Sequence, residues 1–560
     1  MTEPKTVVDE QSVRSMMRGS VWSSERELGD TVGHSLLLAL AIFVVWFPAE
    51  TRPWTVVVIA ATMLALCTWG WRRTGPTGVG WIVGCTVILL TMGFSAASGW
   101  NPSRAVGEVG LMAALAALVW LASRSRPPAV FPALLAVGLA GLALWGLWQV
   151  FIGLEAIRPA IDELAPAARA YAEERAASRR AFASLPLPSH LAVMLATALP
   201  LLAARIRATP KGLCWTAAAG LGFIGLLATR SPVGLGLALL ALIPILFTRR
   251  RVAAGIVVAG LVIGIVAVVV VRPDVASLEP VSLRLDNWST GVWLWATSPA
   301  SGVGVASFAQ ASQANPLEVG NRPAHAHSLP VEVLAELGPA GLVGVAILGV
   351  WLALLIRRLW KNNRSLAVAV AVVPIHNLVD FSIFVSGVAI PWAVLLGWAI
   401  AQGNPEAGRM PAREPRGRLA MVTAVCLALG AAILHTASGE IERAAAAAST
   451  PAIRFTGAQQ ALALAPWRVE PQFLLAASAI DSRDRALLDH AWNQLDRLRW
   501  MRPRSAALAE RRSRLAIARG DISAALAEAW IAAEYGASES EQVWTELIEG
   551  LERTGHGPTG

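Results

Sequence analysis

Long apolar runs, separated by short charged connections, make up most of this 560-residue chain. A run of about 18 or more apolar residues is typical of a transmembrane helix. The predicted spans are residues 33–48, 54–71, 78–95, 105–122, 130–153, 188–204, 212–228, 232–248, 252–271, 338–356, 366–385, 387–402 and 418–436. The predicted fold class is therefore all-α, a polytopic membrane helix bundle of about 12–13 spans.

Positive charge alternates along the connections between these spans. Every second short connection holds a cluster of Arg or Lys residues, whereas those between them hold single positives such as Arg52, Arg104 and Arg230. The clusters lie at residues 72–73, 124–126, 205–211, 249–251, 357–364 and 409–416. Because cytoplasmic loops are enriched in Lys and Arg, the clustered side is predicted to be cytoplasmic. The N-terminal segment, residues 1–32, falls on the same side.

Three stretches are then predicted on the opposite, outer side. Within the membrane domain (33–437) they are a charged segment at 154–187, whose Ala-rich middle from Asp162 to Arg180 is predicted to be helical, and a long loop at 272–337. The third is everything after the last span: a helical domain at 438–553 and a short tail at 554–560. Long loops in compact proteins are usually functional, so these stretches are the first place to look for a site.

The C-terminal domain has a different character from the rest of the chain. It is rich in Ala, Leu, Arg and Glu with helical periodicity, and residues 458–466 and 520–527 look like the ends of helix-turn-helix units. These stretches resemble tetratricopeptide repeats, in which small residues let paired helices approach closely. A generic helical bundle is the alternative that the sequence leaves open.

Composition excludes several other classes of protein. Hydrophobic residues make up 55 % of the chain and charged residues only 15 %, against about 25 % charged in soluble domains. The net charge of +9 comes from clusters between apolar runs, so we expect no nucleic-acid partner. The four cysteines all lie inside apolar runs, without the spacing of a metal site or a disulfide framework. No cofactor motif is present, and we expect none.

The most specific motif lies in the second outer stretch. His327 and Ser328 are followed after nine residues by Gly338, and after two more by Gly341. Pro339 beside Gly338 predicts that a membrane helix begins there, which would place His327 at the outer membrane surface. Upstream residues add to the pattern: Arg284, Trp288, Pro299, Gly302, Gly304 and Phe308. Together these positions resemble the O-antigen ligase family. The alternative for His327 alone is a loop histidine that only hydrogen-bonds the backbone.

Two further arginines fit the same resemblance. Arg230 lies in the very short outer turn Thr229-Arg230-Ser231-Pro232, where the family has an arginine that contacts a lipid pyrophosphate. Arg180 precedes Pro188, which opens a helix as in the family, although Leu187 and Ser189 replace two asparagines of the family pattern. The adjacent Arg179 leaves open which arginine is in register. An interfacial anchor is the structural alternative for Arg230.

A histidine and an aspartate four residues apart, His376 and Asp380, also resemble a stretch of the family. On a helix these positions share a face, so the two side chains are predicted to pair at the outer end of span 366–385. Such a pair could orient the site or only fix helix packing. His325 and His327 lie two residues apart with no third ligand nearby, so no metal site is predicted.

The resemblance implies a membrane glycosyltransferase of O-antigen ligase type. Its donor would be an undecaprenyl-pyrophosphate-linked glycan, and its acceptor a hydroxyl of lipid A-core, a growing glycan or a protein, on the periplasmic face of the bacterial inner membrane. His327 would be the catalytic base, and Arg180, Arg230 and Arg284 would hold the pyrophosphate without a metal. Ser328, Gly338, Gly341, His376 and Asp380 would support the site. A glycolipid transporter or flippase is the non-enzyme alternative.

Overall fold

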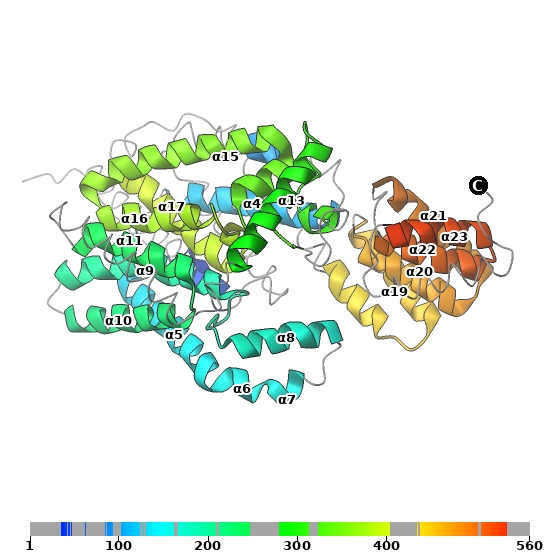
Figure 1. The fold of residues 1–560 in the computed structure, drawn as a ribbon, viewed down its shortest axis with the longest axis horizontal. Helices are drawn as coiled ribbons and strands as arrows, with labels where there is room; N and C mark the ends of the chain where they lie inside the picture. The colour runs from blue at the N-terminus through cyan, green and yellow to red at the C-terminus, as the bar shows by residue number, and fades with distance from the viewer. Residues whose placement is uncertain are drawn as a thin grey trace, which may run out of the picture.

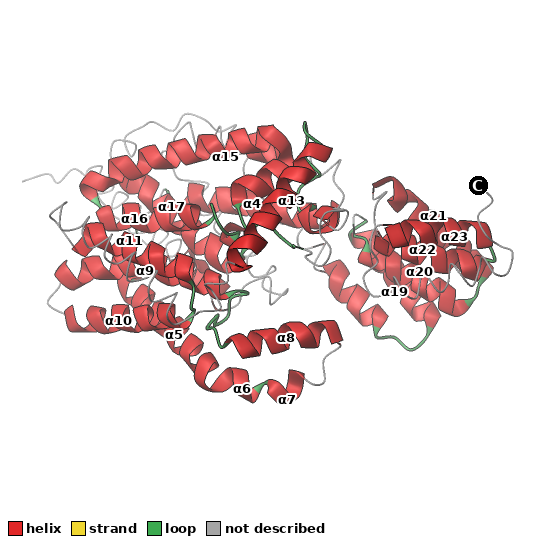
Figure 2. Ribbon diagram, in the orientation of Figure 1, coloured by secondary structure: helices red, strands yellow, loops and turns green. Residues whose placement is uncertain are grey.

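The computed structural model describes most of the chain between residues 102 and 534. The ranges are 102–123, 130–161, 166–208, 212–246, 279–312, 323–403, 437–466, 468–501 and 506–534, with isolated positions between 35 and 92 and at 127, 430 and 434. All regular structure in these ranges is helical (Figure 2). Predicted spans 54–71, 252–271 and 418–436 fall almost wholly outside the described residues, and spans 33–48 and 78–95 are described only in part.

Helices of the membrane domain match the apolar runs closely. Four are long and apolar enough to cross a bilayer by length and composition, namely Phe131–Ala156, Pro188–Ile206, Leu329–Asn362 and Ser386–Gly403. Shorter apolar helices include α4 (Pro102–Ala122), α10 (Gly212–Ala228) and α11 (Pro232–Leu246). An all-α, multi-pass membrane helix bundle is therefore confirmed. The total of 12–13 spans stays a prediction.

Helix α9 (Pro188–Ala208) is the centre of one half of the bundle (Figure 1). It packs against α10, α11 and α16 (Arg364–His376), and its buried Leu191, Leu195 and Leu199 belong to one apolar core. A second core joins α4, α15 (Leu329–Asn362) and α17 (Ser386–Gly403). Several of these helices begin with Pro, whose missing N–H is not needed in the first turn. Both apolar cores hold the helices whose ends carry the predicted site residues.

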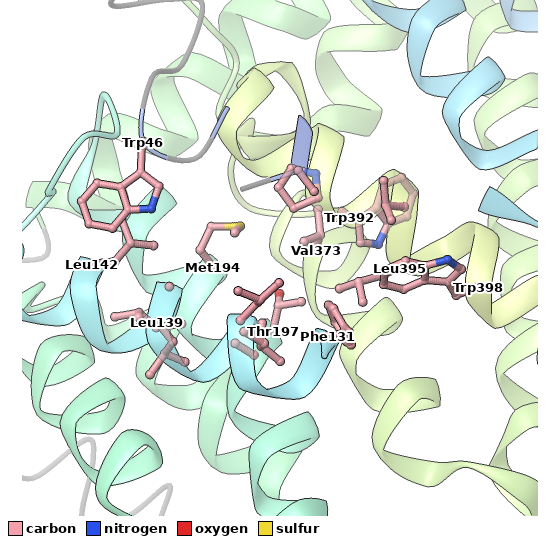
Figure 3. A pocket seen from close by; sticks show the side chains of 18 residues that line it. Trp46, Phe131, Leu139, Leu142, Met194, Thr197, Val373, Trp392, Leu395 and Trp398 are labelled. Carbon is pink, nitrogen blue, oxygen red and sulfur yellow. The ribbon is translucent and has the colours of Figure 1, made fainter. Parts of the chain in front are cut away.

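An apolar cavity of about 100 Å³ lies inside the bundle between α5 (Phe131–Trp148), α9 and α17 (Figure 3). Its polar groups are bonded within the protein. Thr197 Oγ1 donates to Val193 O at 2.8 Å, and Trp392 Nε1 donates to Val370 O at 3.0 Å. The cavity therefore offers no polar group to a ligand, and we assign none to it.

The predicted outer segment 154–187 contains short helices. After a π-helical turn at Gln149–Gly153 come α6 (Leu154–Ala156), α7 (Arg158–Ile161) and α8 (Pro166–Ser178). The helix predicted between residues 162 and 180 is thus present. Buried Gln149 binds the segment after α8: its Nε2 donates to Ala183 O, and its Oε1 accepts from Ala183 N at 2.7 Å. Such π-turns recur at functional sites because they redirect one side chain.

The second outer loop is more structured than predicted. Residues 272–337 were expected to form a loop, but they contain α13 (Glu279–Thr297), α14 (Phe308–Ala311) and the first turns of α15. Polar residues such as Asp286 and Asn287 lower the hydropathy of α13. The membrane helix was expected to begin at Gly338. Helix α15 begins earlier, at Leu329 with Pro330 in its first turn, but Gly338 is a non-helical break that divides it, so a helical segment does start after Gly338 as predicted.

The predicted span 366–385 is also too long. Helix α16 ends at His376, and only a 3-10 turn, Ser382–Phe384, follows before α17. Asn377 explains the end: its Nδ2 donates to Val373 O at 2.8 Å, and its Oδ1 accepts from Ile383 N at 3.0 Å. The next two N–H groups, of Leu378 and Val379, bond carbonyls three residues back instead of four, so the α-helical pattern ends there. The apolar residues beyond it, which suggested a longer span, line a turn instead.

The C-terminal domain is a separate stack of helices (Figure 1). Its elements are α19 (Pro451–Leu464), α20 (Glu470–Ser482), α21 (Arg485–Met501), α22 (Ala506–Arg519) and α23 (Ile522–Glu534). Sequential helices pack on each other around their own core, which includes Leu475, Leu495 and Leu515. Pairing of consecutive helices is present, while the identification as tetratricopeptide repeats stays a prediction.

Candidate active site

Arg180 and Arg230 are brought together by hydrogen bonds between two turns. The α10–α11 turn holds Arg230 at φ 49°, a left-handed conformation that is uncommon for a residue with a side chain. Ala181 N donates to Ala228 O at 3.0 Å, Arg180 Nε donates to Thr229 O at 3.0 Å, and Arg230 Nη1 donates to Ser178 O at 3.3 Å. The fold thus gathers two guanidinium groups at one end of α9.

The neighbouring Arg179 points elsewhere. Its Nη2 lies 3.7 Å from Glu155 Oε2, and both side chains are 61 % exposed. Arg180 is half-buried and contacts the turn that carries Arg230. Of the two arginines whose register the sequence left open, Arg180 is therefore the one that joins Arg230.

His327 lies in a strained turn directly before α15. Its φ is 54°, and Ser328 occupies the N-cap position of the helix. Leu329 N donates to Asn377 O at 2.8 Å, and Trp288 Nε1 donates to His327 O at 3.4 Å. Strained backbone of this kind persists only where surrounding contacts determine it, and it clusters at functional sites.

Asp380 lies between two histidine rings. Its Oδ1 is 3.8 Å from His327 Nδ1, and its Oδ2 is 3.6 Å from His376 Nε2. Both of these ring nitrogens are buried and make no hydrogen bond among the described residues. The predicted His376–Asp380 pairing is present, but a turn after α16 brings the residues together, not a continuous helix. Asp380 is 3 % exposed and His327 about a third exposed, so only the histidine meets the outside.

Phe381 joins the rings of three histidines. The ring of His325 stacks on it at 4.1 Å, and the rings of His327 and His190 meet its edge or face at 4.9 and 5.1 Å. His190 is fully buried in the first turn of α9. The sequence pattern gave no role to His190, although it lies directly after the Pro188–Ser189 stretch that resembles the family.

Two buried acids at the start of α15 were also missed. Glu332 binds His325, with 2.6 Å between its Oε1 and His325 Nδ1. Glu336 accepts from the N–H groups of Ala306 and Phe308, both at 2.9 Å. The sequence does carry a signal for these two acids. Ionisable residues four apart in an apolar helix are costly to bury, and they mark functional or structural sites.

The predicted glycines let the loop cross the helix. Gly338 has φ 67°, and a Cβ built on it would lie 2.7 Å from Ala300 O. Gly302 has φ 68°, and its added Cβ would lie 2.4 Å from the carbonyl carbon of Glu336. Only glycine permits so close a backbone crossing. Gly341 lies one turn further along α15 and is buried.

Charges around the loop set the protonation of its histidines. Burial lowers the pKa of His327, Asp380 opposes this, and the positive charge of Arg284 on α13 lowers it further, with a net shift below the ordinary value. Burial also lowers the pKa of His325, but its bond to Glu332 outweighs burial and raises it. The pKa of Asp380 is lowered, because the surrounding histidines and the Phe381 N–H outweigh its burial. His327 is thus neutral near pH 7, as a general base requires.

The predicted residues therefore form two groups: Arg180 with Arg230, and His327 with Asp380, His376 and Arg284. The first turns of α9 contact both. His190 packs on Phe381, and Ala192 packs against Gly234 at the start of α11, just after the Arg230 turn. Within the described parts of the chain, no cluster of three His, Cys, Asp or Glu residues could hold a metal ion.

A second apolar cavity, of about 280 Å³, lies directly behind the histidine loop. Leu329 and Pro330, which follow the loop, form part of its wall, as does Phe384, whose ring stacks on His325 at 5.8 Å. Residues of α4, α15 and α17 complete it. An apolar space therefore adjoins the polar cluster on the side of the helix bundle.

Comparison with known proteins places the central part of this site in a family. Residues 215–346 match the family model described as O-antigen ligase. This range runs from α10 into α15 and includes Arg230, Arg284 and His327. No curated protein matches the chain significantly. Residues 215–346, which carry Arg230, Arg284 and His327, are therefore similar to the O-antigen ligase family.

Proposed function

We propose that this protein is a membrane glycosyltransferase that moves a glycan from undecaprenyl pyrophosphate to a hydroxyl acceptor at the periplasmic face of the bacterial inner membrane. The observation that carries the proposal is the His327–Asp380 arrangement beside Arg284. A neutral, partly exposed imidazole faces a buried carboxylate through Nδ1, which leaves Nε2 to accept a proton. Hydrogen bonds of this kind are often long before substrate binds.

The proposed reaction is a single displacement. The acceptor hydroxyl gives its proton to His327 Nε2 and its oxygen forms a bond to the anomeric carbon, with inversion. The bond from that carbon to the pyrophosphate oxygen breaks, and its electron pair leaves with undecaprenyl pyrophosphate. Arginines suit the growing negative charge because their planar forks bind phosphate oxygens in pairs. Arg180, Arg230 and Arg284 are the candidates, and with them the step needs no metal.

The apolar cavity behind the loop supports a lipid-linked substrate. A hydrocarbon chain that enters between α4, α15 and α17 would bring its head group to the end of the bundle where Leu329 and Pro330 follow His327. Transfer of apolar chain into such a space is favourable, at about 0.8 kcal/mol for each buried CH₂ group.

The transporter alternative finds less support. Transporters use ionisable groups at mid-membrane. The buried acids of α15 are Glu332 and Glu336. Both instead accept hydrogen bonds from backbone N–H groups of the loops that form the site. Their role is therefore structural, at the end of the helix and not at its centre.

The acceptor class separates a ligase from a polymerase or a protein O-oligosaccharyltransferase. A deletion strain analysed by glycan gel distinguishes them. Unattached long glycan means a ligase, single-repeat glycan means a polymerase, and loss of glycan from proteins alone means an oligosaccharyltransferase. Normal glycans in every fraction would contradict all three.

The base assignment is tested with purified protein and a polyprenyl-pyrophosphate donor. His327→Ala should lower transfer by about 10²–10⁴-fold, the usual contribution of a general base, while donor binding remains. A chelator should leave wild-type transfer unchanged. Full activity of His327→Ala at normal expression would contradict the mechanism, and loss of activity with the chelator would contradict its metal independence.

A further inference from the structure

We infer that Glu332, acting through His325, is a positioning residue that holds the His327 base in place; this inference rests on the proposed function. The carboxylate of Glu332 bonds both residues directly before His327, namely His325 and Ala326. Oε1 lies 2.6 Å from His325 Nδ1, and Oε2 accepts from the Ala326 N–H at 3.2 Å. Glu332 is only 3 % exposed, so water does not compete for these bonds.

The turn at His327 needs such a clamp. Its left-handed φ of 54° is unfavourable for a residue with a Cβ and persists only where neighbours determine it. Downstream, the bond from Leu329 N to Asn377 O fixes the chain. Upstream, Glu332 bonds both His325 and the Ala326 N–H, and Trp288 Nε1 adds a longer bond to His327 O at 3.4 Å. The base is therefore held from both sides, and one carboxylate makes both bonds to the two residues before it.

The Glu332–His325 pair also positions Phe381, against which the ring of His327 packs. His325 stacks nearly parallel on Phe381, at 4.1 Å and 15°. The ring of His327 meets Phe381 edge to face, at 4.9 Å and 80°. A shift of His325 would move Phe381, and the base with it. Glu332 thus acts on the backbone of His327 through Ala326 and on its ring through His325 and Phe381.

Charge makes the pair strong at neutral pH. Glu332 raises the pKa of His325 against the effect of burial, and Glu336 and Glu108 add to the rise. The other groups around His325 are His327 and His190, with Asp380 beyond them. Charged hydrogen bonds are shorter and about twice as strong as neutral ones. Two histidines only two residues apart can therefore keep different protonation states, one for structure and one for catalysis.

The test is a double-mutant cycle on kcat and on the donor KM. Glu332→Gln keeps the size of the side chain and removes its charge, and it should lower kcat by about 10–100-fold, since displacement by about 1 Å can cost 10²-fold. The donor KM should stay within about twofold, because Glu332 does not face the arginines. His325→Gln should behave alike, and the double variant should be no slower than the slower single variant. His490→Gln, in the C-terminal domain, is the control and should match wild type.

Hydrogen exchange supplies a readout that does not depend on activity. The peptide around Ala326 should exchange faster in Glu332→Gln and unchanged in His490→Gln. Multiplicative losses of kcat in the double variant would show that the two residues act separately and would overturn the inference. Wild-type kcat and wild-type exchange in Glu332→Gln would overturn it as well. A wild-type protein without transfer activity would instead contradict the proposed function, while exchange would still decide whether the clamp exists.

Discussion

Arg180 and Arg230 lie together because one backbone bond, from Ala181 N to Ala228 O, and one bond from each arginine side chain join the turns that carry them. Replacing either side chain removes one of these bonds together with the donor contact, while the backbone bond between the turns remains. A hydrogen bond to a charged group contributes about 1.5–3 kcal/mol, which corresponds to about 10–150-fold in donor affinity. Strain at Arg230, by contrast, is a property of the backbone and would remain in an alanine variant.

Arg230→Ala and Arg180→Ala should each weaken donor binding by this amount, measured with purified protein and lipid-linked donor. Arg230→Lys should recover only part of the loss, because an ammonium keeps the charge but not the two-pronged geometry. Arg179→Ala is the matched control and should bind donor normally, since that side chain is exposed beside Glu155. An Arg179→Ala variant as weak as Arg180→Ala would contradict the assignment.

The pKa of His327 predicts the pH dependence of transfer. A base works only when unprotonated, so kcat/KM should fall as pH drops through the pKa of His327. Because this pKa is lowered, the midpoint should lie below the ordinary value of about 6.5. Asp380 raises the pKa, so Asp380→Asn should move the midpoint further down. It should also lower the plateau, because the ring loses the carboxylate that orients it. A midpoint that moves up in Asp380→Asn would contradict this account.

At the scale of elements, α15 joins a segment that binds the outer loops to a membrane helix across the break at Gly338. Its first turns carry Glu332 and Glu336, which bind the outer loops, and the part after Gly338 is apolar. The break at Gly338 lets the 300–304 loop cross, where Val303 N donates to Ala335 O at 2.9 Å and Gly304 N to Glu336 O at 3.0 Å. The break therefore couples the position of the site to the bundle.

Gly338→Ala should destabilise the membrane domain and lower transfer. The left-handed conformation costs a residue with a Cβ about 1–2 kcal/mol, and the added carbon would press on Ala300 O at 2.7 Å. Gly349→Ala is the control in the same helix: nothing lies within 4 Å of its added Cβ, and alanine favours helix by about 1 kcal/mol over glycine. Thermal unfolding in detergent should therefore show a lower midpoint for the first variant and an equal or higher one for the second. Equal midpoints for Gly338→Ala and wild type would contradict the argument.

Hydropathy predicted the helices whose whole surface is apolar. It missed the elements whose bounds depend on individual side-chain bonds or on packing against one neighbouring helix. Residues 212–228 were predicted as a helix and are α10, because no charged residue interrupts the run. The end of α16 depends on bonds made by Asn377, and α13 depends on packing against α15, neither of which a window average detects. Motif spacing found Arg230 and His327. It could not find the Glu332–His325 bond or the place of Phe381, which arise from contacts between segments.

At the scale of the molecule, the predicted site residues gather at one end of the helices, and the described residues of two basic clusters lie at the other. Helices α15 and α16 form a hairpin: Arg357, Arg358 and Lys361 lie near its closed end, whereas Leu329 and Asn377 are bonded at its open end beside His327. The α10–α11 turn carries Arg230, and Arg205 lies in the last turns of α9, which precede the other end of α10 in the chain. This polarity agrees with the positive-inside rule.

A reporter fused after Arg251 or Arg364 should therefore be active as a cytoplasmic reporter. One fused after Ser312 or Gly560 should be active only as a periplasmic reporter. Alkaline phosphatase serves as the periplasmic reporter and a fluorescent protein as the cytoplasmic one. Each fusion is made with both reporters, so that each serves as the control for the other. A cytoplasmic signal after Ser312 would place His327 away from the donor glycan and would contradict the proposed function.

The C-terminal domain is joined to the membrane domain by a short helical segment, residues 437–446. Ser438 Oγ donates to Ala461 O at 2.7 Å, and Arg468 Nη2 donates to Glu442 Oε2 at 2.6 Å, so this segment packs on the domain that follows. The domain has its own apolar core and its own buried charge network, in which Arg512 Nε donates to Glu528 Oε1 at 2.8 Å. These features indicate a helical module with its own core, onto which residues 437–446 pack.

We predict that this module recognises the acceptor or assembles the complex, and does not take part in the chemistry. Truncation after about residue 440 should leave the membrane domain folded, with normal donor binding, but should change acceptor choice or lower the rate of transfer. Arg512→Ala gives the same test without shortening the chain. It removes the buried partner of Glu528 and leaves that carboxylate with the half-exposed Arg499, whose Nη1 lies 3.0 Å from Glu528 Oε1, so the substitution should destabilise this small domain. Both variants should keep the thermal midpoint of the membrane domain in detergent and should show the same loss with natural acceptors. Unchanged transfer to every natural acceptor in the truncated protein would remove this role, and loss of donor binding would show instead that the module supports the site itself.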